Sequence, residues 1–264
     1  MARRRDADGG DRDGRAPRNG EIVSQPDRHG LINSIGSNSI EIWDVQFVNC
    51  ETAFYGNATA SGWFPVNVYN VLFSGCSNGL TGKDTVGQFA FSVVNATADQ
   101  VAILLTGEGV TGNTCYATNS LFTSSGTTGI NLANCYTNAT NTGVYQNVGA
   151  GGYYLATNST NRGVGTASIP SALLEDLQTL TTYPPVVTNG WITNDYTFSP
   201  QVERNTGALD RGYHYVPLDY AMDVDISNAT VTVLPGTALA GYGTYHGIDL
   251  HANGIFICEI LRGS

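Results

Sequence analysis

The sequence has 264 residues, enough for one large domain or two ordinary ones, and its formal net charge is −10. Residues 1–28 carry seven basic and six acidic side chains, whereas the remainder carries five basic and sixteen acidic ones. A body this acidic excludes nucleic-acid binding, which requires a basic surface that displaces counterions from phosphates. Only 13% of the residues are charged and 32 are glycine. This composition excludes long amphipathic helices and favours β-structure with many turns.

Residues 1–28 contain almost no apolar side chains, and we expect a disordered tail because such a segment cannot offset the entropy cost of ordering. The arginine run at residues 3–5 is not a secretion signal, since no apolar segment of about 7 to 15 residues follows it. No stretch of the chain approaches the roughly 20 apolar residues of a membrane span. The sequence therefore predicts no membrane-spanning segment.

Residues 41–50 and 67–76 repeat each other with one constant offset. The aligned pairs are Trp43 with Tyr69, Val45 with Val71, Phe47 with Phe73, and Cys50 with Cys76. Apolar and polar residues alternate before each cysteine, which is the period of a β-strand with one buried face. An offset within the range of roughly 20 to 50 residues indicates stacked turns of a solenoid. The two cysteines would then lie within disulfide range, although small buried thiols are the commoner arrangement.

Later runs continue this pattern, and we expect parallel β-helix coils over residues 29–150. The runs are 88–95, 100–105, 119–125 and 129–135. Residues 119–125 align with residues 70–76, a separation close to two turns of the repeat. Asn and Gly recur at the ends of the runs, where the chain must turn and left-handed backbone angles are tolerated.

The pattern changes at residue 151, and residues 151–215 are predicted to form an irregular insertion. One short helix is expected near residues 170–179, where a proline suits the first turn. One face of this helix carries Leu173, Leu174 and Leu177.

Strand alternation returns within residues 216–264, which we expect to form further β-helix-like strands. The sequence ends soon after such a strand, with no polar cap. An uncapped solenoid end exposes strand edges, so we expect the chain to be a piece of a longer protein.

Two Phe-x-x-Cys runs end at Cys50 and Cys76, and further motifs occupy residues 152–159, 170–174, 182–185, 210–215 and 218–220. Together they resemble the right-handed parallel β-helix repeat proteins of large secreted bacterial polypeptides. The resemblance covers roughly residues 32–264. It implies the pectate-lyase-like coil architecture and an extracellular or cell-surface location. It implies no activity, because one fold carries many functions.

Polysaccharide cleavage is the sharpest enzymatic hypothesis. Glycoside hydrolysis requires two carboxylates on either side of the scissile bond. Asp219, Asp223 and Asp225 cluster in sequence near His214, and strand alternation would place Asp223 and Asp225 outward on neighbouring positions. The sequence motifs of polygalacturonases and pectate lyases are absent, however, and solvated turn carboxylates are the commoner arrangement. We therefore assign no catalytic residue and keep these four as candidates.

The same three aspartates, Asp219, Asp223 and Asp225, offer hard oxygen ligands and are weak candidates for calcium. Their spacing does not fit an EF-hand, and no cofactor is otherwise indicated. His246 and His251 would face opposite ways on a strand, whereas Asp249 and His251 would share the outer face. We interpret these residues as surface groups rather than a metal-ligand set.

Residues 107–112 match the Gly-x-Gly-x-x-Gly pattern of dinucleotide sites. A poor helix former follows them, so a turn is the better interpretation. The sequence contains fourteen tyrosines. Tyrosine rings can stack on sugar rings or on a partner, but they more commonly stack on one another.

The sequence predicts an all-β protein, a right-handed parallel β-helix with one short helix in an insertion. Its predicted function is a non-catalytic extracellular or cell-surface module, a stalk or adhesin that binds glycan or a cell-surface partner. The alternative is a polysaccharide hydrolase or lyase of the pectate-lyase-like superfamily.

Overall fold

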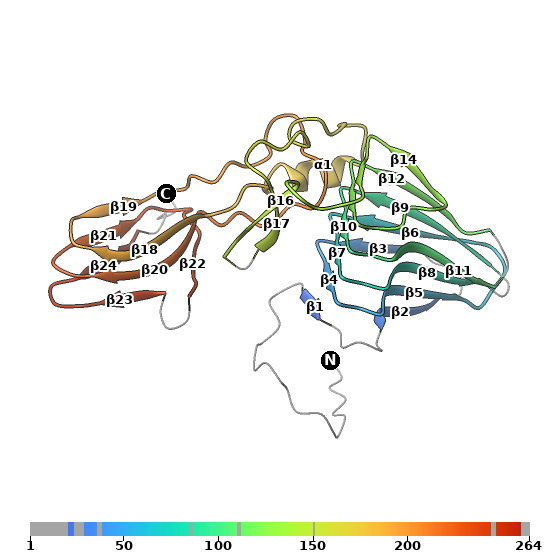
Figure 1. Ribbon diagram of the computed structural model, residues 1–264, viewed down its shortest axis with the longest axis horizontal. Coiled ribbons are helices and arrows are strands. Elements are labelled where there is room, and N and C mark those ends of the chain that lie inside the picture. Colours follow the sequence, from blue (N-terminus) through green and yellow to red (C-terminus); the bar gives the residue numbers. More distant parts are fainter. Residues whose placement is uncertain are drawn as a thin grey trace, which may run out of the picture.

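The computed structural model describes residues 21–23, 29–35, 39–84, 87–109, 112–149, 151–243 and 247–259. Within this part the protein consists of stacked parallel β-sheets and one helix (Figure 1). The expected tail over residues 1–28 lies outside the described residues, except for strand β1 (Glu21–Val23), which adds to a sheet edge. Two stacks of sheets lie at opposite ends of the long axis, with the helix and a β-hairpin between them.

The first stack contains three parallel sheets. The first has the order β1, β4 (Gln46–Val48), β7 (Leu72–Ser74), β10 (Thr97–Asp99), β13 (Leu121–Thr123) and β15 (Tyr136–Asn138). The second comprises β2 (His29–Ile35), β5 (Thr52–Ala58), β8 (Asn78–Asp84) and β11 (Ile103–Gly109). The third comprises β3 (Ile40–Trp43), β6 (Trp63–Tyr69), β9 (Gln88–Val94), β12 (Thr114–Thr118) and β14 (Ile130–Ala133).

The strand register confirms the repeat found in the sequence. Trp43 pairs with Tyr69, and Phe47 pairs with Phe73, as the aligned segments predict. Leu72 pairs with Thr97, which pairs with Leu121, so Leu72 and Leu121 are separated by two passes of the chain. Each pass therefore adds one strand to each sheet, an arrangement compatible with a β-helix. The last pass, from Leu121 to Tyr136, is shorter because it contributes no strand to the second sheet.

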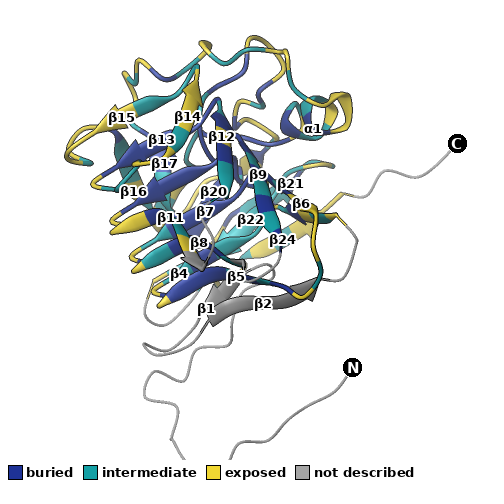
Figure 2. Ribbon diagram, turned by 90° about the vertical axis from the view of Figure 1, so that its right-hand side faces the viewer, coloured by how far each residue is buried: buried dark blue, intermediate teal, exposed yellow. Residues whose placement is uncertain are grey.

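The core of the first stack consists of the inward side chains of successive passes. Phe47 and Phe73 stack with ring centroids 5.5 Å apart, and both are fully buried. Burial of each such ring stabilises the fold by roughly 1.5 to 3 kcal/mol. Cys50 and Cys76 are buried and neither forms a disulfide, so stacking in the core explains their spacing. In Figure 2 strands β7 and β13 carry mainly the buried colour, whereas β14 at the end of the stack is largely in the exposed colour.

Asparagines connect successive passes at one turn of the first stack. The set, called here the asparagine ladder, is Asn70, Asn95, Asn119 and Asn134, with Asp44 in the same role at one end. All five have φ between 51° and 55°, the left-handed region that Asn and Asp tolerate best among residues other than glycine. The Asn119 amide donates to Asn95 Oδ1, and the Asn134 amide donates to Asn119 Oδ1. The expected left-handed turns are thus present and linked to one another.

The second stack contains two parallel sheets. One has the order β18 (Val186–Ile192), β20 (Tyr220–Ile226) and β22 (Leu239–Gly241), with β23 (Ile248–Leu250) also paired to β20. The other has the order β19 (Tyr196–Phe198), β21 (Thr230–Val233) and β24 (Ile255–Cys258). A separate core lies between them, built from Phe198, Tyr220, Met222, Val224, Ile226 and Val231.

The second stack begins earlier in the chain than the sequence predicts. Strands β18 and β19 fall inside residues 151–215, the predicted irregular insertion, yet they pair with β20 and β21. The physical reason is exposure: β18 lies at a sheet edge and most of its side chains face water, so it lacks the alternation of a half-buried strand.

Residues 156–185, the first connection, lead from the first stack to β18. Residues 199–219, the second connection, leave the second stack after β19, contact the first stack and return to β20. The first connection follows an antiparallel hairpin, β16 (Tyr145–Val148) with β17 (Gly151–Leu155). It contains the expected helix, α1 (Ser171–Leu177), whose Leu173 and Leu177 are buried against Tyr69. In the described part of the chain, no helix has the length and apolar character required to cross a membrane.

Candidate functional site

Asp219, a predicted catalytic or calcium-binding candidate, is fully buried in the second connection. Its carboxylate accepts hydrogen bonds from the backbone N–H groups of Gln201, Val202 and Ala238, at 2.8, 2.9 and 2.8 Å. Arg204 Nη1 lies 3.2 Å from the same carboxylate. Burial opposes ionisation, but these donors outweigh it and hold the pKa of Asp219 below its ordinary value. The structure thus uses Asp219 to fix three chain segments together.

His214, the candidate base, is also buried, with 1% of its surface exposed. Its Nδ1 lies 2.9 Å from the Gly212 carbonyl oxygen, and its Nε2 lies 2.5 Å from the side-chain amide of Asn205. Burial lowers the pKa of His214 to about 4, so the ring is neutral at pH 7. With both ring nitrogens occupied by neighbours, His214 lies in the interior of the second connection.

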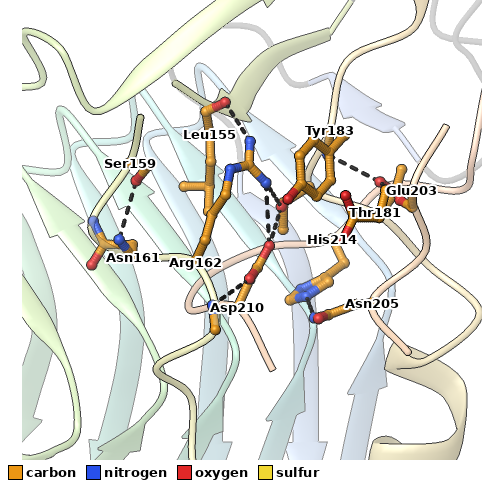
Figure 3. A network of polar contacts seen from close by, with 12 residues as sticks. Leu155, Ser159, Asn161, Arg162, Thr181, Tyr183, Glu203, Asn205, Asp210 and His214 are labelled. Carbon is orange, nitrogen blue, oxygen red and sulfur yellow. Dashed lines mark hydrogen bonds and ion pairs between the residues drawn. The ribbon is translucent and has the colours of Figure 1, made fainter. Parts of the chain in front are cut away.

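A buried ion pair lies beside His214 (Figure 3). Arg162 Nη1 lies 3.3 Å from Asp210 Oδ2, and Arg162 Nη2 donates to the Leu155 carbonyl oxygen at 2.8 Å. The guanidinium also covers the Tyr183 ring, 3.6 Å from its centroid. The Thr182 hydroxyl donates to Asp210 as well. This network ties both connections to the hairpin.

The connections are held against the first stack by the asparagine ladder. The Asn134 amide donates to the Val164 carbonyl oxygen, and the Asn119 side chain bonds both the N–H and the carbonyl of Thr166. In the second connection, Asn95 donates to the Asp210 carbonyl oxygen. Asn95 and Asn119 thus satisfy buried or part-buried backbone groups, whereas the bond of Asn134 is exposed.

Asn70 makes the fourth such contact and links the ladder to a cavity. Its side chain accepts from the His214 N–H at 2.7 Å and donates to the His214 carbonyl oxygen at 3.0 Å. Its amide also donates to Asp44 Oδ1 at 2.7 Å. Asp44, at the end of the ladder, lines the cavity between the two stacks. Two adjacent ladder positions, Asp44 and Asn70, therefore line the cavity, and Asp44 supplies a carboxylate there.

This cavity has a volume of about 1020 Å³ and is the candidate binding site. Side chains of both stacks and both connections line it. Its polar and aromatic lining comprises Asp44, Gln46, Asn70, Asp176, Tyr154, Tyr213, His214, Tyr215 and Tyr242. The cavity also reaches Ala221 of β20 and Ala240 of β22. Amides, carboxylates and aromatic rings together suit a polar ligand with flat apolar faces.

Two carboxylates in this cavity have different surroundings. Asp176, at the end of α1, has a raised pKa because burial disfavours its charged form and because Asp44 is a nearby negative charge. Asp176 Oδ2 is buried, and no described residue donates a hydrogen bond to it. Asp44, by contrast, accepts a hydrogen bond from Asn70. Sequence reasoning missed this pair because the two residues lie far apart along the chain.

The outer face of β20 continues from the cavity lining. Asp223 and Asp225 alternate with the buried Met222, Val224 and Ile226, as strand periodicity predicts, whereas Ala221 on the same face is buried. Trp191 of β18 pairs with Asp225, which pairs with Asp249 of β23. Of these, Trp191 is 61% exposed. A row of aromatic and acidic side chains therefore crosses three strands.

His251 completes this row. Its Nε2 lies 2.8 Å from Asp225 Oδ1 and 3.8 Å from Asp249 Oδ2. Its ring stacks on Trp191 with centroids 4.6 Å apart. The sequence predicts Asp249 and His251 on one outer face, and it misses Asp225 because that residue comes from another strand. His246 lies outside the described residues.

The other sequence patterns have structural positions. Gly107 and Gly109 lie in β11 and pair with β8, so the start of the dinucleotide-like motif is strand. Residues 110 and 111 lie outside the described residues. Tyr215 packs against Tyr154 and Tyr213 with ring centroids 4.4 and 4.9 Å apart, which is the tyrosine stacking expected as the commoner role.

Comparison of the chain with protein-family models, with curated proteins and with solved structures gives no match.

Proposed function

We propose that the chain is a right-handed parallel β-helix module with pectate-lyase-like architecture, and that it binds polysaccharide at an extracellular or cell-surface location. The fold part of this proposal rests on the register of the first stack, where each pass of about 25 residues adds a strand to stacked parallel sheets. In this stalk or adhesin role, the module binds its ligand without making or breaking a covalent bond.

The observation that carries the binding proposal is the cavity together with the exposed row beside it. Tyr242 and the amide of Gln46 line the cavity, and Trp191 extends the surface along the sheet. Sugar rings have apolar faces that stack on aromatic side chains and hydroxyl groups that bond to amides and carboxylates. A cavity and an exposed aromatic side chain on the adjoining sheet face together suit a polymer better than a small compact ligand.

The charge of the surface selects among polysaccharides. Asp44 and Asp176 line the cavity, and Asp223 and Asp225 lie on the adjoining sheet face. Fixed carboxylates repel an acidic polymer at low ionic strength. The proposed ligands are therefore neutral or amino-bearing polysaccharides rather than polyuronates.

Affinity electrophoresis and calorimetry with neutral, amino-bearing and acidic polysaccharides test this proposal. Trp191→Ala is expected to weaken binding about tenfold, which corresponds to about 1.4 kcal/mol for a lost stacking contact. Trp63→Ala is the matched control, since Trp63 is 59% exposed on β6 of the first stack. Absence of binding across the panel, or equal losses in both variants, would contradict the proposal.

A polysaccharide hydrolase is the second candidate function, favoured by the Asp44 and Asp176 pair. A protonated Asp176 would donate its proton to the leaving glycosidic oxygen while Asp44 takes a proton from the attacking water. Water is thereby added across the bond, and the two carboxyl groups exchange protonation states. Burial and the nearby Asp44 charge both raise the pKa of Asp176, which is the direction of shift that a general acid shows.

Release of reducing ends, or of unsaturated ends for a lyase, separates the two functions. For a hydrolase, Asp176→Asn should lower the rate about 10²- to 10⁴-fold and leave polymer binding intact. Asp223→Asn and Asp219→Asn test the residues named from sequence. If no ends are released while binding persists, the non-catalytic role stands and the enzymatic candidate is rejected.

A further inference from the structure

Strand pairing in the second stack brings two carboxylates face to face. Asp225 of β20 is in register with Asp249 of β23, so the two residues occupy neighbouring outward positions on parallel strands about 4.8 Å apart. Like charges placed opposite each other destabilise a sheet unless a cation lies between them. Within the described part of the chain, His251 is the basic side chain within ion-pair distance of both.

The distances between donor atoms fit one coordination sphere. His251 Nε2 lies 2.8 Å from an Asp225 oxygen and 3.8 Å from an Asp249 oxygen, and all three donor atoms lie within 4.8 Å of one another. Ligands about 2.0 to 2.2 Å from a metal ion are themselves separated by at most about 4.4 Å. Small side-chain rotations therefore bring all three atoms to a single ion.

The imidazole is oriented by a separate contact. Trp191, in register with Asp225 on the opposite side, stacks on the His251 ring at 4.6 Å and 38°. The His251 backbone N–H donates to the Ile226 carbonyl oxygen at 2.8 Å. Ring and backbone are thus both held, and Nε2 points toward the carboxylates. Outer contacts that orient a ligating histidine in this way tune metal sites in general.

We propose that Asp225, Asp249 and His251 bind one divalent first-row transition-metal ion, such as zinc, on the outer face of the second stack. One nitrogen and two oxygen donors favour such an ion over calcium or magnesium, which prefer ligand sets made only of oxygen. The three side chains are 29%, 47% and 39% exposed, so water completes the coordination sphere. This proposal is independent of polysaccharide binding.

Calorimetric titration of the untagged full-length chain with Zn²⁺, Co²⁺ and Ca²⁺ tests the site. We expect one Zn²⁺ ion per chain, bound at least tenfold more tightly than Ca²⁺. Asp225→Asn, Asp249→Asn and His251→Ala should each weaken Zn²⁺ binding at least tenfold. Asp223→Asn is the control, because Asp223 lies on the same face of β20 but outside the set, and its variant should bind as the original chain does.

Trp191 supplies a second readout. Co²⁺ bound next to the stacked His251 ring should quench tryptophan fluorescence, and Trp191→Phe should abolish this quenching while calorimetry still shows binding. Three outcomes would overturn the proposal: tighter binding of Ca²⁺ than of Zn²⁺, no Zn²⁺ binding, or unchanged affinity in both aspartate variants. Circular dichroism of each variant verifies that the sheets are formed.

Discussion

The two stacks differ in how completely they cover their own side chains. The first stack has a continuous core and a ladder of buried asparagines, and both connections bond to it. In the second stack, the last strands leave Ile248, Leu250, Ile255 and Ile257 between 37% and 52% exposed. Parallel pairing alone therefore builds a sheet, whereas covering segments are needed to bury its faces.

The carboxylates of the second connection and those of the second stack also differ in burial. Asp210 and Asp219 of the second connection are buried and bonded to donors on several segments. Asp225 and Asp249 of the second stack face water and lie beside Trp191 and His251. The connections thus use buried charge to hold the fold together, whereas the second stack carries its charge at the surface.

Removal of a buried charge should have the largest effect. Asp210→Ala leaves Arg162 buried without its partner, so we expect the free energy of unfolding to fall by about 3 to 5 kcal/mol. Asp225→Ala, on the exposed face, should change it by less than about 1 kcal/mol. Urea denaturation followed by circular dichroism measures both values. Similar losses of unfolding free energy in the two variants would show that the connection and the second stack do not differ in how far their carboxylates stabilise the fold.

Acid should destabilise the protein through His214. The folded-state pKa is lowered to about 4 by burial, whereas the unfolded value is 6.5. Between these pH values the unfolded chain binds a proton that the folded chain does not. The free energy of unfolding therefore falls by about 3 kcal/mol as the pH decreases from 6.5 to 4.

Denaturation curves between pH 7 and pH 4 check this effect. His214→Gln lacks the titrating group and should show a flatter pH dependence than the original chain. Trp63→Ala, an exposed and non-titrating position of the first stack, is the control and should keep the original slope. A slope that His214→Gln leaves unchanged would show that other groups cause the acid sensitivity.

A left-handed asparagine should matter more in the ladder than in the second stack. Asn119→Ala removes bonds to Asn95, Asn134 and Thr166, and we expect a loss of about 2 to 3 kcal/mol. Asn253→Ala removes one exposed bond to Asn228, and about 1 kcal/mol is expected. Both residues have positive φ, so the difference measured by thermal unfolding isolates the ladder bonds. Equal losses of stability in the two variants would show that the effect comes from backbone conformation and not from the ladder bonds.

The first stack was largely predictable because its signals are local and repeated. The sequence alignment of Phe47 with Phe73 is a strand register in the structure, and the helix near Leu173 is present. Strand β18 was not predictable, since an exposed edge strand carries no alternating pattern. The sequence also could not show that Asp219 and His214 are buried, because their partners come from distant segments.

The candidate site was predictable only in fragments. Alternation placed Asp223 and Asp225 on one face of a strand, as the structure shows. Asp225 has Trp191 and Asp249 as its neighbours. These two residues belong to other strands and lie beside Asp225 because of strand pairing. Likewise, the cavity brings together Asp44 and Asp176 from different segments. Register between strands that are far apart in sequence is the information that a single sequence lacks.

The asparagine ladder also sets an order of events during synthesis. Asn134 ends the ladder, whereas the His214 backbone that bonds to Asn70 lies much further along the chain. At a synthesis rate of about 5 to 20 residues per second, the chain between Asn134 and His214 takes roughly 4 to 16 s to make. The first stack can therefore assemble before its covering segment emerges, with the ladder amides still hydrated. Docking of His214 then closes the fold as a late step that joins residues 144 positions apart.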